Sequence, residues 1–105
     1  MSFGATGPTL VISTTATSKS LAWPVGQVSC LVTNPSTTLT VHVTFGIIAA
    51  TAVIPTADGA GAQVYTVPPA TALVIDVTPK GANIVACIAS GAGPTLVSLT
   101  PGREG

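Results

Sequence analysis

Short runs of apolar and threonine residues, separated by glycine and proline turns, limit most strongly what this chain can fold into. Eleven glycines and nine prolines interrupt its 105 residues at short intervals. The runs begin about 8 to 12 residues apart, which is typical of an antiparallel β-sandwich or barrel. A short helix is conceivable only in IIAATA, and we expect none there. The pattern predicts strands over 9–15, 20–23, 27–33, 38–45, 51–54, 62–67, 71–77, 83–89 and 95–100.

The length of the chain is that of one domain, which should bury about two-thirds of the surface that the unfolded chain exposes. We therefore predict an all-β fold: a single-domain antiparallel β-sandwich of jelly-roll or Greek-key type, with about eight short strands. Residues 1–8 are expected to form an extended N-terminal arm, and residues 9–105 the sandwich domain. Phe3 would be unusual on a free tail, so we expect the arm to dock on a surface, with Phe3 and Pro8 among the contact residues.

Charged residues are scarce. They make up 6% of the chain, against about 25% in an ordinary soluble domain. Three scattered cations cannot neutralise a row of phosphates, so neither nucleic acid nor an anionic membrane surface is expected as a partner. A monomer with so uncharged a surface should associate, and we expect other protein subunits to cover much of it. The six charged residues are Lys19, Asp58, Asp76, Lys80, Arg103 and Glu104.

The mean hydropathy of +0.69 raises the question of a membrane span. A spanning helix needs about 18 consecutive apolar residues, and the best candidate, GIIAATAVIP, is about half that length and ends at a proline. The N-terminal MSFGATGPTL has no basic start followed by an apolar run, so we expect no signal peptide. These features give no reason to expect a membrane partner.

The segment TLTVHVTFG, residues 38–46, is the most regular strand pattern in the chain. One side of it is apolar and should fill the core: Leu39, Val41, Val43 and Phe45. The other side is polar and should meet water or a neighbouring subunit. We therefore interpret its members as interface candidates: Thr38, Thr40, His42 and Thr44.

Two further strands, 71–77 and 83–89, are apolar on both faces. Such a strand lies either in the centre of a sandwich or under another subunit. The scarcity of charge favours the second alternative.

The residues for catalysis or metal binding are almost absent. His42 is the only histidine, so it alone could serve as the base for a nucleophile, with Asp58 or Asp76 to orient it. A zinc site needs three or four clustered ligands, and by parity His42 and Cys30 lie on opposite strand faces. We expect no enzyme activity, no metal site and no cofactor.

Cys30 and Cys87 each share a strand face with small apolar residues, so both should be buried. Because both could face one core, free thiols and a Cys30–Cys87 bridge both remain open.

Trp23 and Tyr65 are the only aromatic residues that could form a carbohydrate platform, and for Trp23 we favour core or arm packing.

The order of motifs over residues 41–105 resembles small virion structural proteins of tailed bacteriophages. In that family a strand ending in an aromatic–glycine pair precedes a proline-flanked hairpin, two apolar strands, a closing strand and a Gly-Glu-Gly-like tail. The matching segments here are Phe45–Gly46, Val67–Pro68, Val74–Val77, Ile84–Ala89 and Thr100–Gly105.

The resemblance implies a capsid decoration, or cement, protein on the outer surface of a phage head, made in the host cytoplasm. Its partners would be the major capsid protein and other copies of itself, commonly as a trimer where capsomers meet. Two alternatives stand beside it. One is a phage tail or head–tail structural component, and the other is a ligand- or glycan-binding β-sandwich module.

Overall fold

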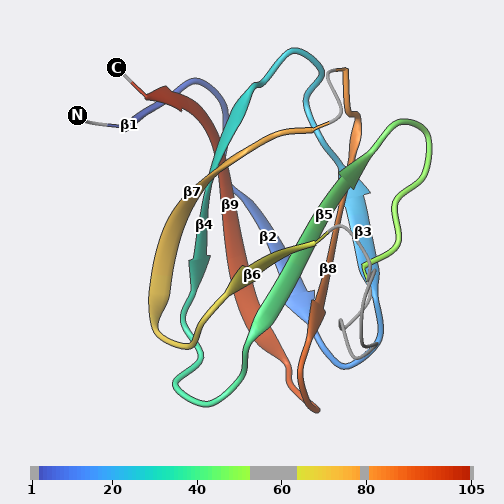
Figure 1. The fold of residues 1–105 in the computed structure, drawn as a ribbon, viewed down its shortest axis with the longest axis vertical. Helices are drawn as coiled ribbons and strands as arrows, with labels where there is room; N and C mark the ends of the chain where they lie inside the picture. The colour runs from blue at the N-terminus through green and yellow to red at the C-terminus, as the bar shows by residue number, and fades with distance from the viewer. Residues whose placement is uncertain (1–2, 53–63, 79–80, 105) are drawn as a thin grey trace, which may run out of the picture.

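The computed structural model describes residues 3–52, 64–78 and 81–104, and within these ranges the chain forms nine strands and no helix (Figure 1). The strands are β1 (Phe3–Ala5), β2 (Leu10–Thr14), β3 (Lys19–Ala22), β4 (Ser29–Asn34), β5 (Val41–Gly46), β6 (Tyr65–Val67), β7 (Thr71–Asp76), β8 (Ile84–Ala89) and β9 (Thr95–Glu104).

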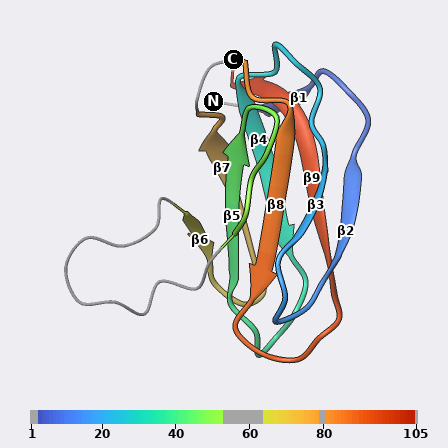
Figure 2. The ribbon, with the colours of Figure 1, turned by 90° about the vertical axis from the view of Figure 1, so that its right-hand side faces the viewer.

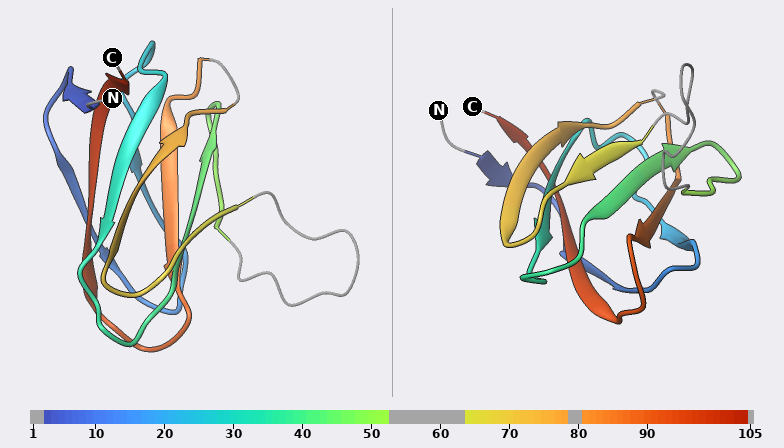
Figure 3. Two further views of the ribbon diagram at one scale, coloured as in Figure 1. Left: turned by 60° about the vertical axis from the view of Figure 1, so that its left-hand side comes forward. Right: turned by 60° about the horizontal axis from the view of Figure 1, so that its bottom comes forward.

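The strands form two antiparallel sheets that lie face to face, as Figure 3 shows. One sheet has the order β1-β9-β4-β7, with β2 also paired to β9, and the other has the order β3-β8-β5-β6. Four strand pairs follow one another along a single long antiparallel ribbon: β2·β9, β3·β8, β4·β7 and β5·β6. The ribbon is rolled up so that β4 also pairs with β9 and β5 with β8, which completes the two sheets. A ribbon rolled in this way is a jelly roll, so the structure confirms the predicted β-sandwich.

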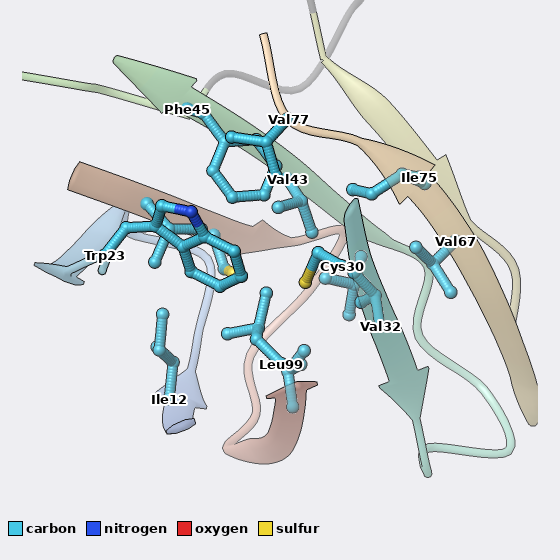
Figure 4. Packing of buried hydrophobic residues seen from close by; sticks show 14 of the residues in the cluster. Ile12, Trp23, Cys30, Val32, Val43, Phe45, Val67, Ile75, Val77 and Leu99 are labelled. Carbon is cyan, nitrogen blue, oxygen red and sulfur yellow. The ribbon is translucent and has the colours of Figure 1, made fainter. Parts of the chain in front are cut away.

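The core between the sheets is built from the alternate residues of each strand, as the period of two requires. Trp23 and Phe45 fill one part of it, with ring centroids 5.1 Å apart in an edge-to-face arrangement (Figure 4). The buried cluster consists of Ile12, Trp23, Cys30, Val32, Val41, Val43, Phe45, Val67, Ile75, Val77, Ala82, Val85, Cys87, Val97 and Leu99.

Several predicted strand bounds differ from the observed ones because of local turn chemistry. The strand expected at 38–45 begins at Val41, since the Ser36 hydroxyl accepts hydrogen bonds from the amides of Thr38 and Leu39 and holds them in a turn. Of the strand expected at 51–54, residues 51 and 52 lie outside any strand, and 53–54 fall outside the described residues.

The strand β1, Phe3–Ala5, lies at the margin of the five-stranded sheet. Phe3 pairs with Glu104 and Ala5 with Gly102, so β9 continues to Glu104 instead of ending at residue 100. Pro8, between β1 and β2, is exposed. Sequence alone did not predict β1, because a Gly- and Ala-containing segment shows no alternation.

Candidate interaction surface

The polar side of β5 does not form an open surface. His42 was expected to meet water or a subunit, yet only 7% of it is exposed, and its Nδ1 lies 3.1 Å from the Thr66 hydroxyl on β6. Thr44, half-buried, pairs with Ala86 of β8. The expectation that His42 is solvated is therefore wrong, and its assignment to a subunit interface stays a prediction.

Residues 47–52, which follow β5, lie over this side of the sheet (Figure 2). Ala50 and Ala52 pack against Ala86 and Ile88, which lie on the outer side of β8. The amide of Ala52 donates a 2.9 Å hydrogen bond to the hydroxyl of Ser18 and fixes the connection there. For β8, the expected cover by another subunit is therefore replaced by an intramolecular one.

The two remaining threonines of the predicted face lie near the opposite end of β5. Thr38 is exposed in the turn between β4 and β5. Thr40 is half-buried; its amide donates to the Ser90 hydroxyl at 3.0 Å, and its carbonyl accepts from the Ser90 amide at 2.9 Å. The four candidates Thr38, Thr40, His42 and Thr44 thus do not form one exposed patch.

In the described part of the chain, the hydrogen-bonding partner of the His42 ring is the Thr66 hydroxyl. Burial lowers the pKa of its imidazole, so the ring is neutral at pH 7. Asp76 is on β7 of the other sheet, and Asp58 lies outside the described residues. Among the residues that the structure describes, no three His, Cys, Asp or Glu side chains cluster in a way that could hold a metal ion.

Trp23 does not form an exposed platform. Only 2% of it is accessible, in agreement with the expected core packing. Tyr65 is half-buried, with its hydroxyl 3.4 Å from that of Thr78. Stacking of a sugar ring needs an open aromatic face, and Trp23 offers none.

Cys30 and Cys87 are free thiols, both fully buried in the core. Burial raises the pKa of each to about 12, and for Cys87 the neighbouring Cys30 adds to the effect.

We predict that neither thiol reacts with a disulfide reagent at pH 8 while the protein is folded, because the reactive thiolate is scarce and inaccessible. Both should react after unfolding in guanidinium chloride. Reaction of one thiol within minutes in the folded protein would contradict this prediction.

A different surface is open: the outer side of the five-stranded sheet. Its members are the residues that alternate with the core positions of β2, β4, β7 and β9. The registers place Val11 opposite Ser98, Ser98 opposite Thr33, and Leu31 between Thr100 and Val74. We call this surface the five-strand face, defined by Val11, Ser13, Leu31, Thr33, Ala72, Val74, Leu96, Ser98 and Thr100.

Large apolar side chains lie open on the five-strand face. The exposed fractions are 51% for Val11, 59% for Leu96 and 37% for Val74. Serine and threonine fill the places between them, and no member carries a charge. The charged residues of this sheet, Asp76, Arg103 and Glu104, follow at the end where β7 and β9 finish. An uncharged, partly apolar sheet surface of this kind is suited to contact with another protein.

A second group of apolar side chains lies exposed in the connections at the end of the sandwich where β3 and β5 finish: Val25, Val28, Ile47 and Ile48. Ile48 is 82% exposed and has a φ of 74°, a left-handed backbone that is rare for a β-branched residue. Its amide is held by the Asn83 side chain at 2.7 Å. A Cβ on Gly46 would lie 2.2 Å from the Ala49 carbonyl oxygen, so this turn requires glycine there.

Neither surface could be located from the sequence. Scarcity of charge indicated that a surface is covered by subunits, but the members of the five-strand face are distributed from residue 11 to residue 100. Only the strand order brings them together.

Comparison with known proteins adds no relative: no family model, no curated protein and no solved structure matches this chain. In the described ranges there is no helix of the length and apolarity that a membrane crossing requires.

Proposed function

We propose that this protein is a structural virion component: a capsid decoration protein that binds the outside of a phage head and stabilises the joints between capsid subunits. The observation that carries the proposal is the five-strand face, which is broad, uncharged and partly apolar. A face of this composition would be unfavourable on a protein that stays alone in water. It is suited to burial against a second protein.

The action would be mechanical. A copy that seats its five-strand face across a joint between major capsid proteins binds the assembled shell and not the separated subunits. By mass action, such binding stabilises the assembled state alone. Each bound copy therefore opposes the internal pressure of packaged DNA, and the symmetric shell offers the same site many times.

The fold is compatible with this function. Jelly rolls occur in viral capsid domains, but also in lectin domains and cupins, so the fold by itself selects no function. Burial of Trp23 favours protein contact over glycan binding, since it removes one of two candidate platforms. The proposal keeps self-association, for which the resemblance implies a trimer, and a tail or head–tail position is its alternative within the virion.

A charge placed on the five-strand face at Leu96, near the start of β9, should weaken head binding. In Leu96→Lys, docking would bury an ammonium group without a partner, and we expect the affinity for undecorated heads of the phage that encodes the protein to fall at least about tenfold. The matched control is Ser20→Lys, which adds the same charge at an exposed position of the other sheet and should bind like the wild type. Co-sedimentation with heads measures the affinity, and cryo-electron microscopy measures the occupancy.

Three outcomes would contradict the proposal. Wild-type protein that does not bind heads removes the decoration function. Sixfold or twelvefold rings on tails would indicate the tail alternative. Retention of a defined sugar on a glycan array, without head binding, would indicate the ligand-binding module.

A further inference from the structure

The strand β7 forms an open edge of the five-stranded sheet. In the described part of the chain it pairs with β4 alone, and in Figure 1 it forms the left-hand margin of the ribbon below the termini. Natural edge strands are usually protected by shortness, lysine, proline or a bulge. β7 has six residues, TALVID, in unbroken register with β4, and its only charge is Asp76 at the end. By contrast, β1 and β6 are three residues long, and β3 carries Lys19.

The register with β4 shows which backbone groups of β7 have no partner in the sheet. The amide of Val77 donates to the carbonyl of Val28 at 2.9 Å, and residues 28 and 77 are opposite each other in the same register. In an antiparallel pair, residues that point their N–H and C=O to the partner alternate with residues that point them away. The backbone N–H and C=O groups of Leu73 and Ile75 therefore point to β4. Those of the alternate residues point outward from the edge: Ala72, Val74 and Asp76.

We propose that two copies of this chain pair through their β7 edges, antiparallel, about a two-fold axis at Val74. A two-fold axis perpendicular to the sheet keeps both outer faces on one side, and Val74 then lies opposite Val74 of the second copy. The same register places Ala72 opposite Asp76 of the second copy. All three residues with outward backbone groups thereby acquire hydrogen-bonding partners.

The charges and the apolar surface both suit a second copy at this edge. Asp76 meets the small, neutral Ala72 and not another carboxylate, so the pairing brings no like charges together. The five-strand face continues across the axis from Val74 to Val74 of the second copy, which doubles the uncharged surface. In an isologous contact both copies use the same edge, so two copies leave no β7 edge unpaired. Pairing of β7 with the β2 edge of another copy would be head-to-tail, and each pair would still have one free β7 edge and one free β2 edge.

Disulfide trapping tests the register. In Val74→Cys, the two introduced cysteines would have Cα atoms about 5.5 Å apart, within the disulfide range of roughly 4.4–6.8 Å. Ala72→Cys is the matched control on the same edge, because its two copies would be offset by four residues, about 14 Å. Mild oxidation should convert most of the Val74→Cys protein, and little of the Ala72→Cys protein, into a covalent dimer. The native Cys30 and Cys87 are buried and should not contribute.

Solution mass tests the pairing without any added cysteine. Light scattering of the wild type at about 100 µM should give twice the chain mass of 10.2 kDa. Val74→Lys places two like charges at the axis and should give a monomer, whereas Val11→Lys, on the β2 edge, should stay dimeric. A wild-type monomer or trimer, equal crosslinking of the two cysteine variants, or dissociation by Val11→Lys would each overturn the inference.

The inference does not rest on the proposed function, and the pair would take the place of the trimer that the resemblance implies. A wild-type monomer that still decorates heads would remove the β7 pairing and leave the decoration function standing. A dimer that fails to bind heads would do the reverse.

Discussion

Replacement of Trp23 by alanine should destabilise the folded protein by about 3–5 kcal/mol, which is the usual cost of removing a large aromatic side chain from a packed core. Trp23 is almost fully buried and packs edge-on against Phe45 at a centroid distance of 5.1 Å. Its own amide also donates to the Asn83 carbonyl at 2.8 Å, so the backbone around the ring is fixed and cannot collapse into the cavity. Guanidinium denaturation followed by far-UV circular dichroism measures the loss.

Trp23→Phe is the informative control, because the indole Nε1 is buried without a hydrogen-bond partner among the described residues. Phenylalanine gives up part of the packing but removes this unpaired donor, whose burial costs about 1–3 kcal/mol. The two effects oppose each other, and we expect a net change of about 1 kcal/mol or less. An alanine variant as stable as the phenylalanine variant would show that the ring does not support the core.

Because Trp23→Ala should destabilise the fold, this substitution cannot serve as a test of glycan binding. A Trp23→Ala variant that fails to bind a sugar would report loss of the fold and not loss of a platform. Tyr65, half-buried on β6, is the aromatic residue at which substitution remains interpretable.

Strand pattern predicted the fold well where alternation is clear. The stretch 38–46 placed Val41, Val43 and Phe45 in the core, and all three are buried there. Leu39, expected with them, is only half-buried because the strand begins two residues later. Period-two alternation specifies which side of a strand a residue occupies, and it does so without knowledge of the neighbours.

Alternation does not specify which part of the protein or solvent covers the side of a strand that faces away from the core. His42 and Ile88 are opposite each other on the outer side of the second sheet, and the chain from residue 46 to residue 52 returns over that side. That return depends on the turn at Gly46 and on the Ala52–Ser18 hydrogen bond, which are features of tertiary structure. The polar side of β5 was therefore assigned to water or a neighbouring subunit, although Ala50 and Ala52 of the same chain pack on this side of the sheet, over β8.

The sequence did not show where an uncharged surface lies. The scarcity of charge predicted that part of the surface meets other subunits; this stays a prediction, and the five-strand face is the uncharged surface at which it can be tested. Its members Val11, Leu31, Val74 and Leu96 come from four strands whose order follows from the jelly-roll topology. No local pattern in the sequence relates these positions to one another.

Asn34 is a further residue whose role only the structure reveals. The sequence TNPST indicates a turn, and the Asn34 side chain does accept the Ser36 amide, as asparagine commonly does in turns. However, its Nδ2 also donates to the carbonyls of Leu39, Val67 and Pro68, at 2.8, 3.2 and 3.2 Å. One buried amide thus joins the β4–β5 turn to the end of β6.

Asn34→Ala should therefore destabilise the protein by about 2–4 kcal/mol, more than the loss of an ordinary hydrogen bond. Alanine leaves the Val67 carbonyl and its neighbours without their donor, in a place where Asn34 itself is only 1% exposed. Thr37→Ala, at an exposed position of the same turn, is the control and should change stability by no more than about 0.5 kcal/mol. Denaturant midpoints at constant m-value measure both changes. Equal midpoints for the two variants would mean that water replaces the Asn34 amide, and that the two turns are held together by the packing of β4 against β7 instead.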